Sequence, residues 1–214
     1  GNFMNKLWVV TKNEFKRYFL SPLAYVYLIS FLILNGSFAI YFGHFFGRGR
    51  ADLLPMFGYQ PWLYLLFIPG ISMRLWAEEF RTKTILQLVT QPLTVATLVW
   101  GKFFASWLFC ALALILTFPF WLTVNLLGTP DNAVIALSYV GSLILAGCML
   151  AISQTLSSLT KNQVIALVLS VIVNLLFFLC GIEYVLSFFR GLVPLSVIDM
   201  IASFSFITHF DTLI

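Results

Sequence analysis

Apolar segments alternate with short polar stretches along most of this chain. The apolar segments are residues 23–46, 62–76, 98–127, 133–159 and 164–182. A helix needs about 20 mostly apolar residues to cross a bilayer, so the pattern predicts an all-helical (all-α) integral membrane protein with at least five transmembrane helices. The second segment is short, and Pro69-Gly70 predicts an interruption in it. Pro119 predicts a kink in the third, because proline lacks a backbone donor and clashes with the preceding turn.

The chain before the first apolar segment has a different pattern. At residues 5–21, tryptophan, valine and phenylalanine side chains interleave with charged ones. The charged residues are Lys6, Lys12, Glu14, Lys16 and Arg17. This mixture is typical of an amphipathic helix that lies on the bilayer surface. Ser21-Pro22 then predicts the point at which the chain turns into the membrane.

Polar and small side chains inside the apolar segments predict contacts between helices. We expect four amide side chains to form interhelical hydrogen bonds worth about 1 kcal/mol each, or else to line a substrate path. They are Asn35, Asn125, Gln154 and Asn174. The fourth segment also carries small residues that let helices pack closely: Gly141, Ser142, Ala146, Gly147, Ala151 and Ser153. This helix is therefore expected to contact protein as well as lipid.

Composition agrees with a membrane protein. Hydrophobic residues make up 61% of the 214 residues and charged residues 9%, which leaves too few polar side chains to cover a water-soluble domain. We expect residues 1–214 to form one membrane domain, with spans one to five within residues 22–182. The net charge of +4 is spread along the chain without a basic helix or zinc framework, so nucleic acid is not an expected partner.

The distribution of charge predicts how the chain crosses the membrane. With a cytoplasmic N-terminus, five spans would leave only Arg48, Arg50 and Arg190 of the twelve Lys and Arg residues outside. Cytoplasmic loops carry the excess of Lys and Arg, so this orientation is favoured. Residues 183–214 are amphipathic and too polar for a clean sixth span. They predict an extracytoplasmic tail of interfacial or re-entrant helices.

The most informative polar stretch joins the second and third apolar segments. It reads Arg74-Leu-Trp-Ala-Glu-Glu-Phe-Arg-Thr-Lys-Thr-Ile-Leu-Gln-Leu-Val-Thr-Gln-Pro, and a Gly-Lys pair opens the next segment. This pattern resembles the first cytoplasmic loop of ABC-2 type permeases. The matching residues are Glu78, Glu79, Arg81, Thr84, Thr90, Pro92, Gly101 and Lys102. Three positions depart from the usual Gly, Glu and Leu of that loop: Lys83, Leu86 and Gln87.

The amphipathic segment ending in Ser21-Pro22-Leu23 is similar to the elbow helix of the same family, above all of its gliding-motility-type permeases. The family usually has six spans, of which this sequence is predicted to contain five. The resemblance implies a multi-pass subunit of an ATP-driven exporter in the bacterial cytoplasmic (inner) membrane. The implied partners are a soluble ABC ATPase that carries ATP and Mg, a second permease copy or a related permease, membrane lipid and an extracytoplasmic accessory subunit.

Physical reasoning gives the loop a role independently of the family. The segment from Thr84 to Thr90 is apolar, and Pro92 ends it, so it predicts a short helix that buries one face in a groove of a partner. Its apolar residues are Ile85, Leu86, Leu88 and Val89. Coupling to the ATPase is therefore assigned to Glu78, Glu79, Arg81, Thr84, Ile85, Leu88, Thr90, Pro92 and Lys102. An ordinary surface helix remains the alternative for the loop.

The charges of this loop have two interpretations. Glu78 and Glu79 are predicted either to pair with Arg81, Lys102 or the charges at residues 5–21, or to be simply solvated. Either way, they form no cluster of the kind that catalysis requires.

Other functions lack their sequence signatures. No Gly-x4-Gly-Lys-Ser/Thr loop occurs, so ATP hydrolysis is assigned to another chain and no cofactor is expected in this one. His44 and His209 have no carboxylate or thiol at metal-ligand spacing, so no metal site is predicted. An ion-gradient-driven secondary transporter or channel is the main alternative, but it needs an ionisable group near the middle of a span. A membrane enzyme or assembly scaffold is the third.

Overall fold

The structure is a computed structural model that describes residues 2–38, 40, 59–73, 75–76, 83, 86–87, 90, 92–180 and 203. Within these residues all regular structure is helical and no strand occurs. The helices are α1 (Asn2–Leu20), α2 (Pro22–Ser37), α4 (Gln60–Ser72), α7 (Val95–Ile115), α8 (Phe118–Leu127), α9 (Asn132–Ser158) and α10 (Gln163–Leu179). The predicted all-helical fold is confirmed for the described part of the chain.

Polar side chains mark where several helices begin. The hydroxyl of Ser21 accepts a hydrogen bond from the backbone of α2, and the hydroxyl of Thr94 does the same for α7. Asp131 accepts from two backbone N–H groups at the start of α9, and Asn162 from one at the start of α10. These caps satisfy donors that the first helical turn leaves without partners. The four side chains therefore help to fix where these helices begin.

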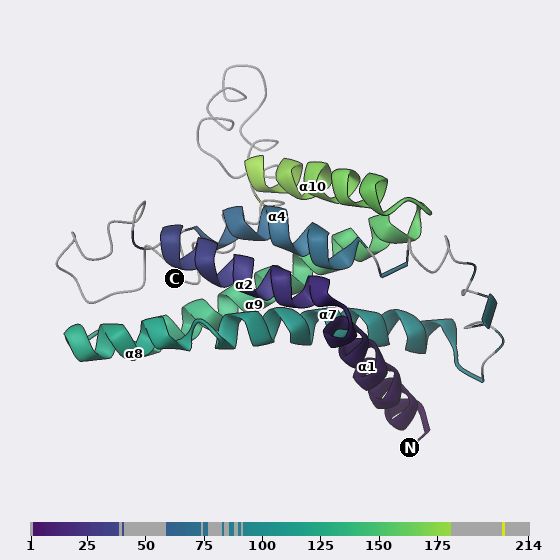
Figure 1. The fold of residues 1–214 in the computed structure, drawn as a ribbon, viewed down its shortest axis with the longest axis horizontal. Helices are drawn as coiled ribbons and strands as arrows, with labels where there is room; N and C mark the ends of the chain where they lie inside the picture. Colours follow the sequence, from purple (N-terminus) through teal and green to yellow (C-terminus); the bar gives the residue numbers. More distant parts are fainter. Residues whose placement is uncertain are drawn as a thin grey trace.

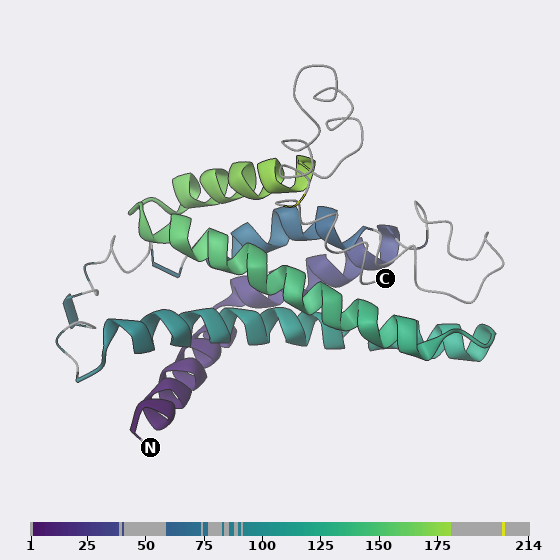
Figure 2. The same cartoon turned by 180° about the vertical axis from the view of Figure 1, so that it is seen from behind.

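The helices are arranged around α4. It contacts α2, α9 and α10, while α7 contacts α1 and α9. Figure 1 shows α7 and α8 running end to end, with α1 diverging from the other helices toward the N-terminus. In Figure 2, seen from behind, α9 crosses α7 at an angle. α1 meets α2 at a bend of 81°, which places the amphipathic helix across the direction of the apolar ones.

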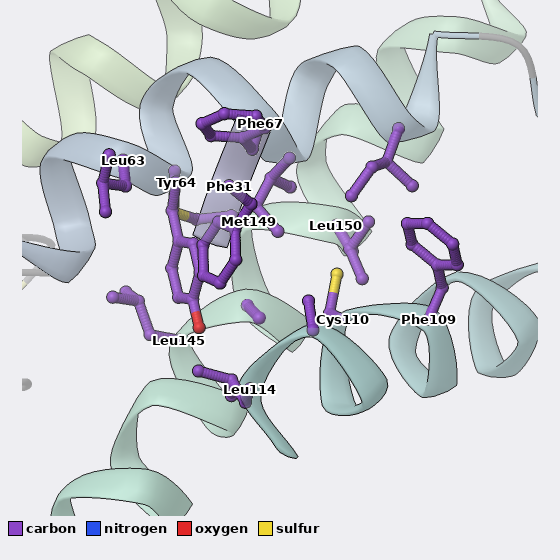
Figure 3. Close-up of a cluster of buried hydrophobic side chains, with 14 of the residues drawn as sticks. Phe31, Leu63, Tyr64, Phe67, Phe109, Cys110, Leu114, Leu145, Met149 and Leu150 are labelled. Atoms are coloured by element: carbon purple, nitrogen blue, oxygen red, sulfur yellow. The ribbon is translucent and has the colours of Figure 1, made fainter. Parts of the chain in front are cut away.

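The core lies where α2, α4, α7 and α9 meet. Figure 3 shows aromatic rings of α4 and α2 facing aliphatic and sulfur-containing side chains of α7 and α9. The rings of Phe31 and Tyr64 stack at 6.3 Å between centroids, and Phe31 meets Phe67 edge to face at 5.6 Å. Nearly every residue of α4 is buried. This helix is therefore surrounded by protein.

Among the residues that the structure describes, two helices are long and apolar enough to cross a membrane: Val95–Leu127, which joins α7 and α8, and Asn132–Ser158. Counting the bent pair of α1 and α2 as one span makes three, and Gln163–Leu179 is a shorter apolar helix. The described part of the chain thus has fewer such helices than the five predicted spans. The predicted ends of the first and fifth spans lie at residues 41–46 and 181–182, outside the described residues.

Proline acts differently in two of the predicted spans. The kink expected near Pro119 coincides with the break between α7 and α8. α7 ends at Ile115, whose carbonyl is the one that the ring of Pro119 would meet. The interruption expected at Pro69-Gly70 was wrong, because α4 continues through Pro69 to Ser72.

Neighbouring groups allow α4 to continue. The Ser72 hydroxyl donates to the carbonyl of Ile68 at 2.9 Å, and the amide of Met73 donates to the carbonyl of Pro69 at 2.9 Å. The helix begins at Gln60, so Gln60 and Pro61, which directly precede the apolar segment 62–76, belong to it.

Candidate functional site

A buried lysine of α7 joins α7 to α1. The side chain of Lys102 is 2% exposed, and its Nζ lies 3.3 Å from Oε2 of Glu14 on α1. The other carboxylate oxygen, Oε1, accepts a hydrogen bond from Arg17 at 3.0 Å. Nζ also lies 5.3 Å from the centre of the Trp76 ring. A buried charge is stable only with such partners, so these residues hold the ammonium in place.

Close packing accompanies this charged contact. A Cβ atom added at Gly101 would overlap Cγ1 of Val10 and lie 3.0 Å from its Cβ, so only glycine lets α1 approach α7 this closely. Leu75, Trp76 and Leu98 form an apolar cluster with Val10. The lysine contact thus lies beside a dry interface between the two helices.

A hydroxyl pair continues the contact along the same two helices. The Ser106 hydroxyl donates to the carbonyl of Lys102 at 2.8 Å, and the Tyr18 hydroxyl lies 2.9 Å from Ser106 Oγ. Because the single hydrogen of the Ser106 hydroxyl goes to that carbonyl, the Tyr18 phenol acts as the donor in this pair. Glu14, Tyr18 and their partners on α7 thus fix both the register and the separation of α1 and α7.

A cavity of about 400 Å³ opens beside these residues, among α1, α2, α4 and α7. Glu14, Arg17 and Lys102 line its charged side. Its other walls are mainly apolar and include Leu23, Ile71 and Phe109. The cavity is therefore amphipathic, with ionic groups at one side and hydrocarbon at the other.

Both ends of the segment that resembles the ABC-2 loop are attached to neighbouring helices. At its start, the amide of Trp76 donates to the Ser157 hydroxyl of α9 at 3.3 Å, and that hydroxyl donates to the carbonyl of Met73 at 3.2 Å. At its end, Nζ of Lys6 on α1 donates to the carbonyl of Pro92 at 3.1 Å. A displacement of the segment would consequently act on α1 and α9.

Only part of the predicted coupling set belongs to the described residues. Thr90, Pro92 and Lys102 do, and of these Lys102 lies in the contact with α1. Leu86 and Gln87 are helical, and the amide of Thr90 donates to the carbonyl of Leu86 at 3.2 Å. The remaining members lie outside the described residues: Glu78, Glu79, Arg81, Thr84, Ile85 and Leu88. The tail predicted at 183–214 also lies outside them, apart from Ser203.

Three of the four amides predicted to bond between helices do so. Nε2 of Gln60 donates to Oδ1 of Asn35 at 3.1 Å, and Nδ2 of Asn174 donates to the Ser153 hydroxyl at 2.9 Å. Gln154 donates to the carbonyl of Val99 at 3.1 Å. Asn125 differs, because it bonds to the carbonyl of Trp121 in its own helix. The three interhelical bonds stabilise the packing of the bundle, although Nδ2 of Asn35, Oε1 of Gln60 and Oδ1 of Asn174 are buried without a hydrogen-bond partner.

Sequence reasoning singled out Lys102 but not its partner Glu14, nor the cavity beside them. The sequence shows Glu14 as the one acidic residue among the basic ones at residues 5–21. A charge pattern alone does not indicate that this residue pairs with a lysine far away in the sequence. Among the described residues, no three His, Cys, Asp or Glu side chains gather where they could hold a metal ion.

Comparison with models of protein families, with curated proteins and with solved structures finds no match to this chain. The described part of the chain defines the class only as a helical protein with two helices able to cross a membrane, or three if the bent pair of α1 and α2 is one span, and with the amphipathic helix α1 fixed to α7.

Proposed function

We propose that this chain is the membrane-spanning permease subunit of an ATP-driven exporter of the ABC-2 type. A partner ATPase would hydrolyse ATP, and the loop between α4 and α7 would transmit the resulting movement to the spans. The observation that carries the proposal is the attachment of this loop to α1. Lys6 bonds to Pro92, and Glu14 pairs with Lys102 immediately after the loop. A force applied to the loop would thus reach α1 and α7 together.

The backbone conformation of Lys83 supports the resemblance to the ABC-2 loop, although a lysine at this position departs from the usual residue of that loop. Lys83 has φ 59°, in the left-handed region that glycine adopts at no steric cost. ABC-2 loops usually carry glycine here. The departure therefore changes the side chain and keeps the backbone conformation that the family residue would favour.

Leu86 supports the docking role of the loop. It is helical and its side chain is 68% exposed. A contiguous patch of exposed apolar side chains is the usual sign of an interaction surface, and Leu86 would be one member of such a patch. A soluble ATPase with a matching groove would bury this side chain, and with it the apolar residues predicted on the same helix.

The finer topology belongs to the same proposal. Five spans would leave the loop and the N-terminus in the cytoplasm, and a second permease copy would complete a path between two subunits. In the described bundle the three buried amides of the predicted set each bond to another helix, which supports a packed bundle within one chain. Transport between two subunits therefore fits better than a channel within one.

Leu88→Asp tests the proposed coupling helix. An aspartate in a docked apolar face would place a charge where it cannot be solvated. We expect the variant to insert normally but to lose the co-purifying ATPase subunit by about tenfold or more. The measurement is mild-detergent purification from the native host, followed by ATP hydrolysis in the eluate and mass-spectrometric identification of a chain with a Gly-x4-Gly-Lys-Ser/Thr loop.

Gln87→Asp is the matched control, because it adds the same charge at an exposed, polar position of the same helix. It should retain the ATPase. The coupling assignment would be wrong if Leu88→Asp kept full co-purification and transport, or if both variants lost the ATPase equally.

A further inference from the structure

The amphipathic cavity follows two of the helices that surround it. It borders α7 from Lys102 to Phe109 and α2 from Ser21 to Tyr27. At 1.5 Å of rise per residue, each of these stretches is about 10 Å long. Ile71, in the last turn of α4, belongs to the same lining. The cavity thus extends from the ionic groups at the end of the bundle into its apolar part.

The polar groups around the cavity already have partners within the protein. Oε1 of Glu14 accepts a hydrogen bond from Arg17 at 3.0 Å, and its Oε2 lies 3.3 Å from Nζ of Lys102. The Tyr18 hydroxyl bonds to Ser106 at 2.9 Å. A charged headgroup would compete with these contacts, whereas hydroxyl groups can exchange hydrogen bonds beside them without needing a counter-ion. The polar side of the cavity therefore favours an uncharged headgroup.

The apolar walls favour a hydrocarbon chain for the rest of the ligand. Leu23 and Ala24 of α2, Ile71 of α4 and Phe109 of α7 line this part of the cavity. Covering such walls with apolar surface is favourable. The volume of about 400 Å³ is in the range of cavities that hold drug-sized ligands, and a phospholipid with two acyl chains is much larger than these. One hydrocarbon chain is therefore the better fit.

We propose that this cavity binds a single-chain lipid whose headgroup is uncharged and carries hydroxyl groups, as in a monoacylglycerol. The hydrocarbon chain lies along α2 and α7, against Leu23, Ile71 and Phe109. The headgroup lies beside Glu14 and Lys102 and leaves their ion pair in place. The bound lipid fills the space at the bend between α1 and α2 and joins α1 to the apolar helices.

This proposal rests on the chain being embedded in a membrane and does not depend on the partner ATPase. The test therefore uses the purified full chain alone, in nanodiscs of phosphatidylcholine. The probe is a trace of monomyristoylglycerol that carries a diazirine in its chain, and mass spectrometry locates the label after irradiation. Phe109 is 1% exposed and lines the cavity, whereas Ile172 on α10 is 48% exposed. Label at Phe109 therefore reports the cavity, and label at Ile172 reports the surrounding lipid.

Unlabelled monomyristoylglycerol should compete only at the cavity. At roughly ten times its half-saturating concentration, it should lower the label at Phe109 about tenfold, because the two lipids share one site. The label at Ile172 should stay unchanged. Equal changes at the two positions, or no label at Phe109, would overturn the site.

Two further arms distinguish the class of lipid. Tetradecyl sulfate and tetradecyltrimethylammonium carry permanent charges on a chain of the same length. Each should compete about tenfold less well, because its headgroup competes with contacts made to charged groups. Equal competition by either would overturn the uncharged headgroup. Phosphatidylcholine with the same diazirine chain should not label Phe109, and saturable labelling by it would assign the cavity to a bilayer phospholipid instead.

Leu23→Trp should lower the label at Phe109 about tenfold, because the indole ring occupies space that the chain needs. Val26→Trp is the matched control, since Val26 lies on the same helix, is 56% exposed and does not line the cavity. It should change the label less than about twofold, as surface substitutions usually do. Equal losses in both variants would contradict the site. Circular dichroism checks folding, and the competition in the wild-type chain decides the proposal if Leu23→Trp does not fold.

Discussion

Lys102 carries a charge inside the described bundle, where burial of a charged side chain is unfavourable. An ammonium group with a 2% exposed side chain carries a desolvation penalty of several kcal/mol, which partners must offset. Glu14 offsets part of it as a counter-ion, and the Trp76 ring adds a cation–π contact. Such a pair stabilises the fold only while both partners are present. It therefore specifies how α1 sits on α7.

This interdependence predicts a rescue. Glu14→Gln should destabilise the chain by about 3 kcal/mol, because it removes a carboxylate that lies 3.3 Å from the buried ammonium. Adding Lys102→Met should recover about 1 to 3 kcal/mol, since methionine fills the apolar volume of the lysine stem without its charge. Thermal unfolding in detergent, followed by circular dichroism, measures both effects.

Lys12→Gln serves as the control for this rescue, because Lys12 is exposed on the same helix, and it should shift the transition little. A double variant no more stable than Glu14→Gln alone would contradict the assigned role of the pair.

The sequence predicted which residues would form hydrogen bonds between helices, but not which residues they would bond to. Asn35 and Asn174 were expected to bond between helices because an amide inside an apolar bundle must find a polar group, and both do. Their partners, Gln60 and Ser153, depend on how helices from distant parts of the chain are rotated. The same holds for Glu14 and Lys102, which are far apart in sequence. Local pattern contains no information about that rotation.

At the scale of elements, the contact between α1 and α7 depends on one glycine. Gly101 allows Val10 to pack directly against the α7 backbone, and this closeness brings Glu14 within reach of Lys102 and Tyr18 within reach of Ser106. Small residues at helix crossings play this role widely in membrane proteins. Separating the two helices should weaken every contact between them.

Gly101→Ala should accordingly destabilise the chain. Overpacking costs about 1 to 3 kcal/mol. This cost exceeds the stabilisation of about 0.5 to 1 kcal/mol that alanine provides over glycine inside a helix. Val10→Ala in the same chain should restore about 1 kcal/mol, because it removes the methyl groups that the new Cβ would meet. Unfolding temperature in detergent measures the three variants.

Gly36→Ala is the matched control, since among the described residues its Cβ would meet the Phe120 ring, at 3.2 Å, and a ring edge can shift. A Gly101→Ala chain as stable as the wild type would show that α1 and α7 are not in close contact.

Helix positions followed from the sequence wherever apolar length and turn residues agreed. α9 and the joined α7 and α8 begin and end close to the ends of the apolar segments 133–159 and 98–127, and Asp131 and Asn162, in the short polar stretches that follow these helices or precede them, cap α9 and α10. The interruption predicted at Pro69 failed for a physical reason. α4 is buried on nearly all sides, and neighbouring groups satisfy the backbone around the proline. Tertiary packing outweighed local preference there.

At the scale of the whole molecule, several contacts place basic residues at one end of the bundle. Lys6 reaches Pro92 just before α7, and Lys102 lies in the second turn of α7 beside Glu14. Lys161 follows α9, whose Ser157 contacts the end of α4. The opposite end of the described bundle, where α8 turns into α9, carries the acidic Asp131. This asymmetry is what an orientation set by positive charge requires.

The asymmetry predicts that the N-terminus and the loop between α4 and α7 share the cytoplasmic side. Single cysteines at Asn13, Gln91 and Arg50, in a chain lacking Cys110, Cys148 and Cys180, would be exposed to a membrane-impermeant thiol reagent in intact cells. Only the cysteine at residue 50 should react, and permeabilisation should make those at residues 13 and 91 react. The bond between Lys6 and Pro92 requires that residues 13 and 91 behave alike. Reaction at residue 91 from outside would reverse the orientation and remove the loop from the reach of any cytoplasmic ATPase.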